Sequence, residues 1–232
     1  IDEKKANVST ASGKAVVVTA NPLASDAALR ALKEGGTAMD AVVTAQTVLS
    51  VVEPQSSGLG GGAFLMYWDQ ATQSLYAFDG RETASAQMDE TMWTTSDGKV
   101  IPWLKATRSL SSIGVPGTTA LLWEGHQKFG RLPWEVNFKK SIDLAKNGFV
   151  PSPRFLRSIA LAQKIGIAHS PTFKSLYLPN GSFPLQKVPF YNYKLAATLS
   201  RLAKGGVNEF YRGEIAHKLF ADLQLQQNSN EP

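Results

Sequence analysis

The residue best suited to ligand chemistry is Arg81, which lies in the tetrapeptide Asp79-Gly80-Arg81-Glu82. A guanidinium presents its N–H groups as a planar fork that can bond both oxygens of a carboxylate in parallel, which a lysine cannot do. The arginine follows an apolar segment, residues 75–78, so its side chain is expected at the end of a strand. On the residues alone, a local ion pair with Glu82 or Asp79 is favoured over a ligand-binding role, and both interpretations remain open.

A glycine run precedes this tetrapeptide and contains Gly58, Gly60, Gly61 and Gly62. Glycine has no Cβ, so it lets one backbone segment lie close to another or adopt positive φ in a tight turn. A phosphate-binding loop is the alternative. The run lacks Gly-x-Gly-x-x-Gly spacing and a Lys-Ser or Lys-Thr pair, and it leads into a strand rather than a helix. The sequence therefore favours close packing and argues against nucleotide binding.

Three segments are expected to be β-strands. Residues 63–68 and 75–78 are apolar and aromatic, and a turn-forming segment, residues 69–74, separates them. Residues 15–19, AVVVT, form a continuous run of β-branched residues, which predicts a fully buried strand.

Two helices are expected to lie between these strands. Asn21 and Pro22 give a cap followed by a proline at the first helical position, and Gly35 ends that helix. Thr37 and Asp40 have the spacing of a capping box at the start of the next helix. That helix, residues 38–52, is apolar nearly all round, which predicts burial on several sides.

The second half of the chain is expected to be mainly helical. A loop-rich stretch is predicted at residues 168–190, which contain four prolines and an Asn-Gly turn, and residues 1–13 are expected to form a mobile arm. The helices predicted after Gly117 cover residues 118–129, 133–147, 152–166, 192–203 and 213–226.

Composition excludes several classes of function. The 24 Lys and Arg residues exceed the 19 Asp and Glu residues by five, but the charges are scattered, so no basic stripe for nucleic acid is present. The sequence has no cysteine, which excludes disulfides and thiolate metal sites. His126, His169 and His217 lack metal-ligand spacing, so no metal and no cofactor is expected. No apolar stretch reaches 18 residues, which predicts no membrane span.

The order of elements predicts an α+β fold that this chain does not complete. No repeat or linker divides residues 1–232, so they are expected to form a single domain. Three strands are fewer than the five or six of an average sheet. The missing strands are therefore expected from further polypeptide.

Five ordered blocks of the sequence resemble the start of the large subunit of the γ-glutamyltranspeptidases. This is an N-terminal-nucleophile hydrolase family that also includes cephalosporin-acylase-like members. Two departures are Thr37, where Asn is usual, and Gly80, where many members carry Phe, and the second bears on acceptor and acyl-group preference. The blocks are residues 21–25, 32–41, 53–64, 79–82 and 114–117, with weaker matches at residues 145–149 and 209–213.

The resemblance implies the αββα sandwich of N-terminal-nucleophile hydrolases, to which this chain would supply helices and part of the sheet. In that family a precursor cleaves itself, and the new N-terminal threonine of the small subunit is the nucleophile, with its own α-amino group as general base. An acyl-enzyme forms from a γ-glutamyl donor such as glutathione, and water or an amine then takes the acyl group. This chain would hold no catalytic residue; Arg81 would bind the α-carboxylate of the substrate, and Glu82 would orient Arg81.

The partners implied are the small subunit from the same precursor and a γ-glutamyl substrate, and the implied location is periplasmic or secreted. Two alternatives stay open. One is a cephalosporin or glutaryl acylase of the same family. The other is a non-catalytic relative that acts as a binding subunit.

Overall fold

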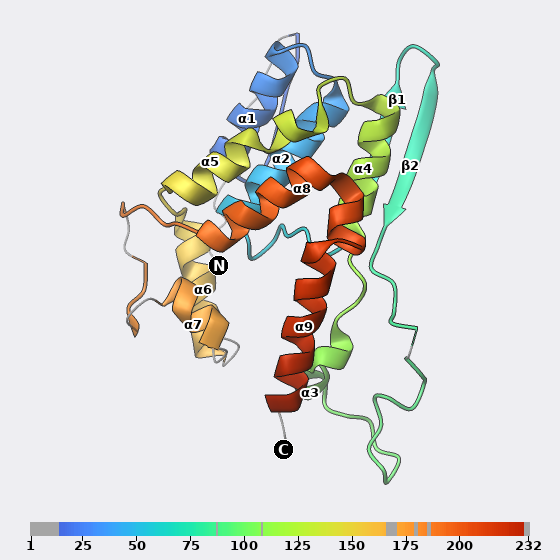
Figure 1. Ribbon diagram of the computed structural model, residues 1–232, viewed down its shortest axis with the longest axis vertical. Helices are drawn as coiled ribbons and strands as arrows, with labels where there is room; N and C mark the ends of the chain where they lie inside the picture. Colours follow the sequence, from blue (N-terminus) through green and yellow to red (C-terminus); the bar gives the residue numbers. More distant parts are fainter. Residues whose placement is uncertain are drawn as a thin grey trace, which may run out of the picture.

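The computed structural model is mainly helical, with a β-hairpin at one edge of the molecule beside α4 (Figure 1). The structure describes residues 14–229, apart from 87, 108, 166–170, 179–180 and 185–186. The arm expected at residues 1–13 lies outside the described residues. The elements are α1 (Pro22–Lys33), α2 (Ala38–Val52), β1 (Ala63–Asp69), β2 (Ser74–Gly80), α3 (Trp103–Ala106), the 3-10 helix η1 (Leu110–Ser112), α4 (Thr118–Phe129), the 3-10 helix η2 (Trp134–Phe138), α5 (Lys139–Asn147), α6 (Pro153–Lys164), α7 (Pro171–Tyr177), α8 (Tyr193–Tyr211) and α9 (Glu214–Ser229).

The first two helices begin at the predicted caps. Asn21 Oδ1 accepts a hydrogen bond from the Leu23 nitrogen at 3.0 Å, and Pro22 takes the first helical position. At α2, the Thr37 nitrogen donates to Asp40 Oδ2 at 2.8 Å and the reciprocal bond is also present, which confirms the capping box. Helix α2 is buried along most of its length, as its composition predicts.

The predicted hairpin is present, and one of its faces packs against α4 (Figure 1). The strands pair antiparallel, from Ala63 opposite Gly80 to Asp69 opposite Ser74. On the inner face, Tyr67 stacks on Phe129 of α4 with ring centroids 4.2 Å apart. The outer face is apolar and exposed, and its largest side chains are Phe64, Met66, Trp68 and Leu75.

The strand predicted at residues 15–19 is wrong. This segment has no regular secondary structure and pairs with no strand in the part of the chain that the structure describes, and Val18 is 85% exposed. A β-branched run favours an extended backbone, but a strand also needs a neighbour for its backbone N–H and C=O groups. The sheet of the described chain therefore has two strands, not three.

Helices α4, η2 and α5 pack on α2, and α8 packs on these three in turn. The segment predicted as one helix at 133–147 is divided into η2 and α5, and Trp134 Nε1 donates to the Leu202 carbonyl of α8 at 3.1 Å. Helix α8 continues to Tyr211, beyond the predicted end at residue 203, with a break at Gly206. Helix α7 lies inside the stretch predicted to be loop. Within the described residues, no helix is both long and apolar enough to cross a bilayer.

Candidate functional site

Arg81 lies directly after the last residue of β2, as predicted, and its guanidinium points into solvent. The Arg81 nitrogen donates to Asp79 Oδ1 at 2.9 Å, which fixes the turn out of the strand. The side chain is 72% exposed, and its Nε lies 3.3 Å from Glu82 Oε2. Among the described residues, Glu82 is the acidic partner of Arg81, and the contact between them is made at Nε.

The ion pair favoured on the residues alone is therefore present, and the Arg81 side chain remains largely exposed beside it. An exposed pair of this kind contributes about 0–1 kcal/mol to stability. The terminal nitrogens keep the geometry that bonds a carboxylate in parallel. The structure thus brings Arg81 and Glu82 together and leaves the first able to bind an anion.

Glu82 is held between two glycines. A Cβ at Gly62 would lie 2.9 Å from the Glu82 nitrogen and would overlap its carboxylate. A Cβ at Gly114 would lie 2.8 Å from the Glu82 Cβ. Any side chain at either glycine would therefore displace the residue that pairs with Arg81.

The segment Gly114–Thr118 packs along the other side of the tetrapeptide. The Val115 nitrogen donates to the Thr83 carbonyl at 2.9 Å, and these two residues form an isolated antiparallel bridge. The nitrogens of Gly117 and Thr118 both donate to the Gly61 carbonyl at 3.0 Å. The glycine run, the tetrapeptide and this segment therefore form one backbone cluster around Arg81.

In the glycine run, Gly62 is the glycine that close packing requires. Gly62 has no room for a Cβ, whereas nothing lies within 4 Å of a Cβ at Gly60, and a Cβ at Gly61 would make only ordinary contact with Glu82 at 3.5 Å. Gly61 contributes its carbonyl instead. The run enters β1 rather than a helix, so it offers no helix N-terminus for a phosphate.

Two further glycines matter here, and sequence reasoning did not single them out for packing. A Cβ at Gly80 would lie 2.6 Å from the Leu121 Cβ of α4. A Cβ at Gly117 would lie 2.9 Å from the Arg81 carbonyl and would overlap the Gly80 carbonyl. A phenylalanine at position 80, which the resemblance makes usual, would not fit here unless α4 moved.

Buried polar groups anchor the helices around this cluster, and sequence reasoning did not identify most of these contacts. Glu53 is 1% exposed and accepts hydrogen bonds from Asn21 Nδ2 and Ser152 Oγ, each at 2.9 Å. Asp40 is fully buried; its Oδ1 lies 3.2 Å from Nε2 of His126, which is itself buried.

His217 is exposed, and His169 lies outside the described residues. No group of three His, Asp or Glu within the described chain could hold a metal ion.

The surroundings of Arg81 are open. Two surface hollows, of about 310 and 600 Å³, are lined by residues of α1, α2, η2, α5 and the loops near them. Neither is lined by Arg81 or Glu82. This chain therefore presents the guanidinium but does not enclose it.

Comparison with known proteins gives a consistent result. The family model described as Gamma-glutamyltranspeptidase matches residues 24–229. The glutathione hydrolase proenzyme of Bacillus subtilis strain 168 is 35% identical over 211 residues, which cover 90% of this chain and 35% of that protein. The γ-glutamyltranspeptidase of Pseudomonas nitroreducens complexed with L-DON superposes with a TM-score of 0.82 at 30% identity, covering 91% of this chain and 61% of that one. The Helicobacter pylori γ-glutamyltranspeptidase gives a TM-score of 0.86 at 28% identity, covering 93% and 61%.

The fold is that of the N-terminal-nucleophile hydrolases, and the chain supplies helices and a two-stranded part of the sheet. The chain belongs to the γ-glutamyltranspeptidase family, as the five sequence blocks predict. It spans about a third of the length of the curated relatives that it matches.

Proposed function

We propose that this chain is a large-subunit part of a γ-glutamyltransferase or glutathione hydrolase, in which Arg81 binds the α-carboxylate of the γ-glutamyl donor. The observation that carries the proposal is the exposed fork of Arg81, fixed by its backbone at the end of β2 in a chain of this family. A bidentate contact would hold the donor by one end, and its γ-carbonyl would then lie at a set distance from the nucleophile. Glu82 orients the guanidinium through Nε.

The nucleophile belongs to further polypeptide, the small subunit released from the same precursor. Two features of the structure support a missing partner. The outer face of the hairpin is apolar and uncovered, with Phe64 68% and Met66 70% exposed. Val16 and Val18 are also exposed, in a segment for which the described residues provide no strand partner. Strands and side chains from the rest of the precursor would cover both and complete the domain begun by residues 1–232.

The reaction proposed here is the one that the resemblance to the family implies. The N-terminal threonine attacks the γ-carbonyl, the amine leaves with a proton, and a γ-glutamyl ester forms on the enzyme. Water or the amine of an amino acid or peptide then attacks the ester and releases the threonine. Arg81 contributes only binding and orientation. Its removal should therefore slow both half-reactions, the acylation by the donor and the deacylation of the γ-glutamyl ester. The resemblance to the family also supports export to the periplasm or the medium.

Turnover by the complete protein tests this function. We expect it to hydrolyse γ-glutamyl-p-nitroanilide faster than glutaryl-p-nitroanilide, and we expect a co-purifying subunit whose N-terminal residue is threonine. A preference for the glutaryl substrate, which lacks the α-amino group, would indicate the acylase alternative. Absence of turnover together with a partner that does not begin with Thr or Ser would indicate the non-catalytic alternative.

A further inference from the structure

Tyr211, in the sequence block Glu209–Gly213, makes two long-range hydrogen bonds to the segment beside Arg81. Its hydroxyl donates to the Pro116 carbonyl at 2.6 Å and accepts from the Ala120 nitrogen at 3.2 Å. Burial raises the pKa of Tyr211 and outweighs the opposite effect of the Ala120 hydrogen bond, so the hydroxyl stays protonated and able to donate. Tyr211 thus joins the end of α8 to the turn before α4.

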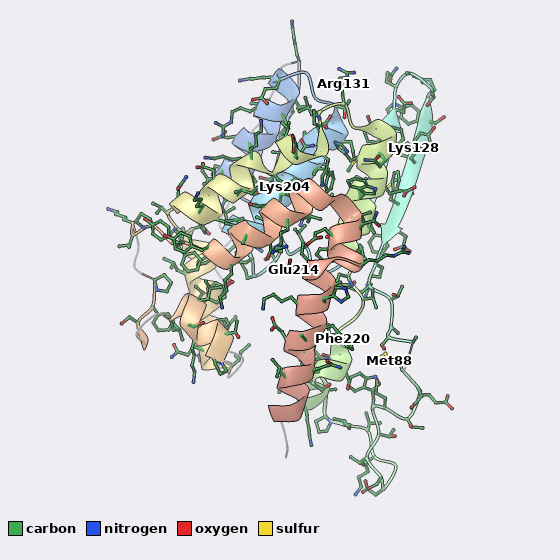
Figure 2. The ribbon with its side chains drawn as sticks, viewed as in Figure 1. Met88, Lys128, Arg131, Lys204, Glu214 and Phe220 are labelled. Carbon is green, nitrogen blue, oxygen red and sulfur yellow. The ribbon has the colours of Figure 1, made fainter. Side chains whose placement is uncertain are left out.

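A break in α8 brings Tyr211 to this place. Gly206 has φ 61° and ψ −157°, a backbone conformation that L side chains rarely adopt. A Cβ there would also lie 2.7 Å from the Trp123 ring of α4. Figure 1 shows α8 changing direction near its end, and in Figure 2 Lys204 lies before the change and Glu214 follows it. The second part of α8 is thereby directed toward the start of α4.

The carbonyl that Tyr211 holds is central to the backbone cluster around Arg81. On one side of Pro116, Val115 forms the bridge with Thr83. On the other side, Gly117 lies against the carbonyls of Gly80 and Arg81. Contacts to this one segment therefore flank Arg81 on both sides along the chain.

We propose that Tyr211 is a positioning residue for Arg81: its hydroxyl holds Pro116, and the segment around Pro116 fixes the backbone from which the guanidinium extends. This inference rests on the proposed role of Arg81 in binding the α-carboxylate. It assigns a role to the Glu209–Gly213 block, which contributes no side chain to the anion site itself.

A purely structural Tyr211 would behave differently. If the hydroxyl only stabilises the fold, its removal lowers activity on all substrates alike. If the hydroxyl acts through Arg81, its removal lowers kcat/KM only on substrates with an α-carboxylate. It has no further effect in a variant that already lacks Arg81.

The test uses the complete protein and the variants Y211F, R81A and R81A/Y211F, with Y193F as the matched control. Tyr193 is exposed at the opposite end of α8, where it stacks on Tyr191. kcat and KM are measured on γ-glutamyl-p-nitroanilide and on 4-aminobutyryl-p-nitroanilide, which lacks the α-carboxylate. We expect Y211F to lower kcat/KM on the first substrate about 3- to 10-fold, mainly through KM, because the hydroxyl loses its hydrogen bonds to the Pro116 carbonyl and from the Ala120 nitrogen. The second substrate should be unaffected, R81A/Y211F should equal R81A, and Y193F should equal the parent.

Equal losses on both substrates, or losses that add to those of R81A, would overturn the inference. Should Y211F not fold, Pro116→Gly takes its place, since it loosens the same segment and leaves α8 intact; a selective loss supports the inference and an equal loss overturns it. If R81A distinguishes the two substrates and Y211F does not, only the role of Tyr211 fails. If R81A itself does not distinguish them, the proposed function of Arg81 fails as well.

Discussion

Gly62 lies directly against Glu82, so that a Cβ at position 62 would come within 2.9 Å of the Glu82 backbone nitrogen. Glu82 pairs with Arg81 Nε, and this contact makes the glycine part of the anion site rather than a spacer before β1. The same run contains Gly60, which has open space at the Cβ position. The two glycines therefore provide a matched pair for mutagenesis.

Gly62→Ala in the complete protein should lower kcat/KM on γ-glutamyl-p-nitroanilide and destabilise the fold by about 1–3 kcal/mol, the usual cost of forcing an atom into a packed site. Gly60→Ala should leave both quantities unchanged. Thermal unfolding and steady-state kinetics measure them. Equal behaviour of the two variants would show that Glu82 can move without cost.

Asp40 should give the fold an acid-sensitive anchor. Burial alone would raise the pKa of Asp40, but hydrogen bonds from Thr37, Arg131 and Asn137 outweigh it and lower the pKa below 3.8. The ionised carboxylate therefore stabilises the fold above about pH 4, and this contribution is lost as the pH falls through the lowered pKa.

Asp40→Asn should accordingly cost at least about 2 kcal/mol of stability at pH 7, since it weakens several charge-assisted hydrogen bonds. The difference from the parent should shrink below about pH 4. Asp26→Asn, on the exposed side of α1, is the control and should change little. Unfolding temperatures measured between pH 7 and pH 3 would contradict this account if the Asp40 difference did not depend on pH.

The outer face of the hairpin should be an internal surface of the complete protein. Met66→Lys places a charge on a side chain that is 70% exposed in this chain. If further polypeptide covers that face, the buried, unpaired ammonium should cost about 3 kcal/mol or more and prevent assembly or precursor cleavage. Gln70→Lys, at the exposed turn of the hairpin, should be tolerated. A Met66→Lys precursor that matures and melts like the parent would show that this face remains open to solvent.

Sequence predicted the parts of the fold that depend on local chemistry. The caps at Asn21 and Thr37 were predictable because each side chain bonds a backbone group two or three residues away. The strand expected at residues 15–19 failed because pairing depends on a neighbour that the described chain does not provide.

The site was predictable in part for the same reason. Arg81 could be placed at a strand end from its neighbours alone. The need for glycine at position 62 depends on Glu82, 20 residues away, and the contact of Tyr211 with Pro116 spans 95 residues. No local pattern encodes such contacts, so only the folded chain reveals them.

The role of Arg81 can be tested most directly by measuring kcat/KM for the parent, Arg81→Lys and Arg81→Ala on two substrates, γ-glutamyl-p-nitroanilide and 4-aminobutyryl-p-nitroanilide. Arg81→Lys keeps the positive charge but loses the planar fork. Its kcat/KM on the first substrate should therefore lie between the values for the parent and for Arg81→Ala. The coupling between Arg81 and the α-carboxylate should be about 2–5 kcal/mol, with folding and self-cleavage unchanged. A coupling near zero, with both substrates losing the same factor, would contradict the account and assign Arg81 a structural role.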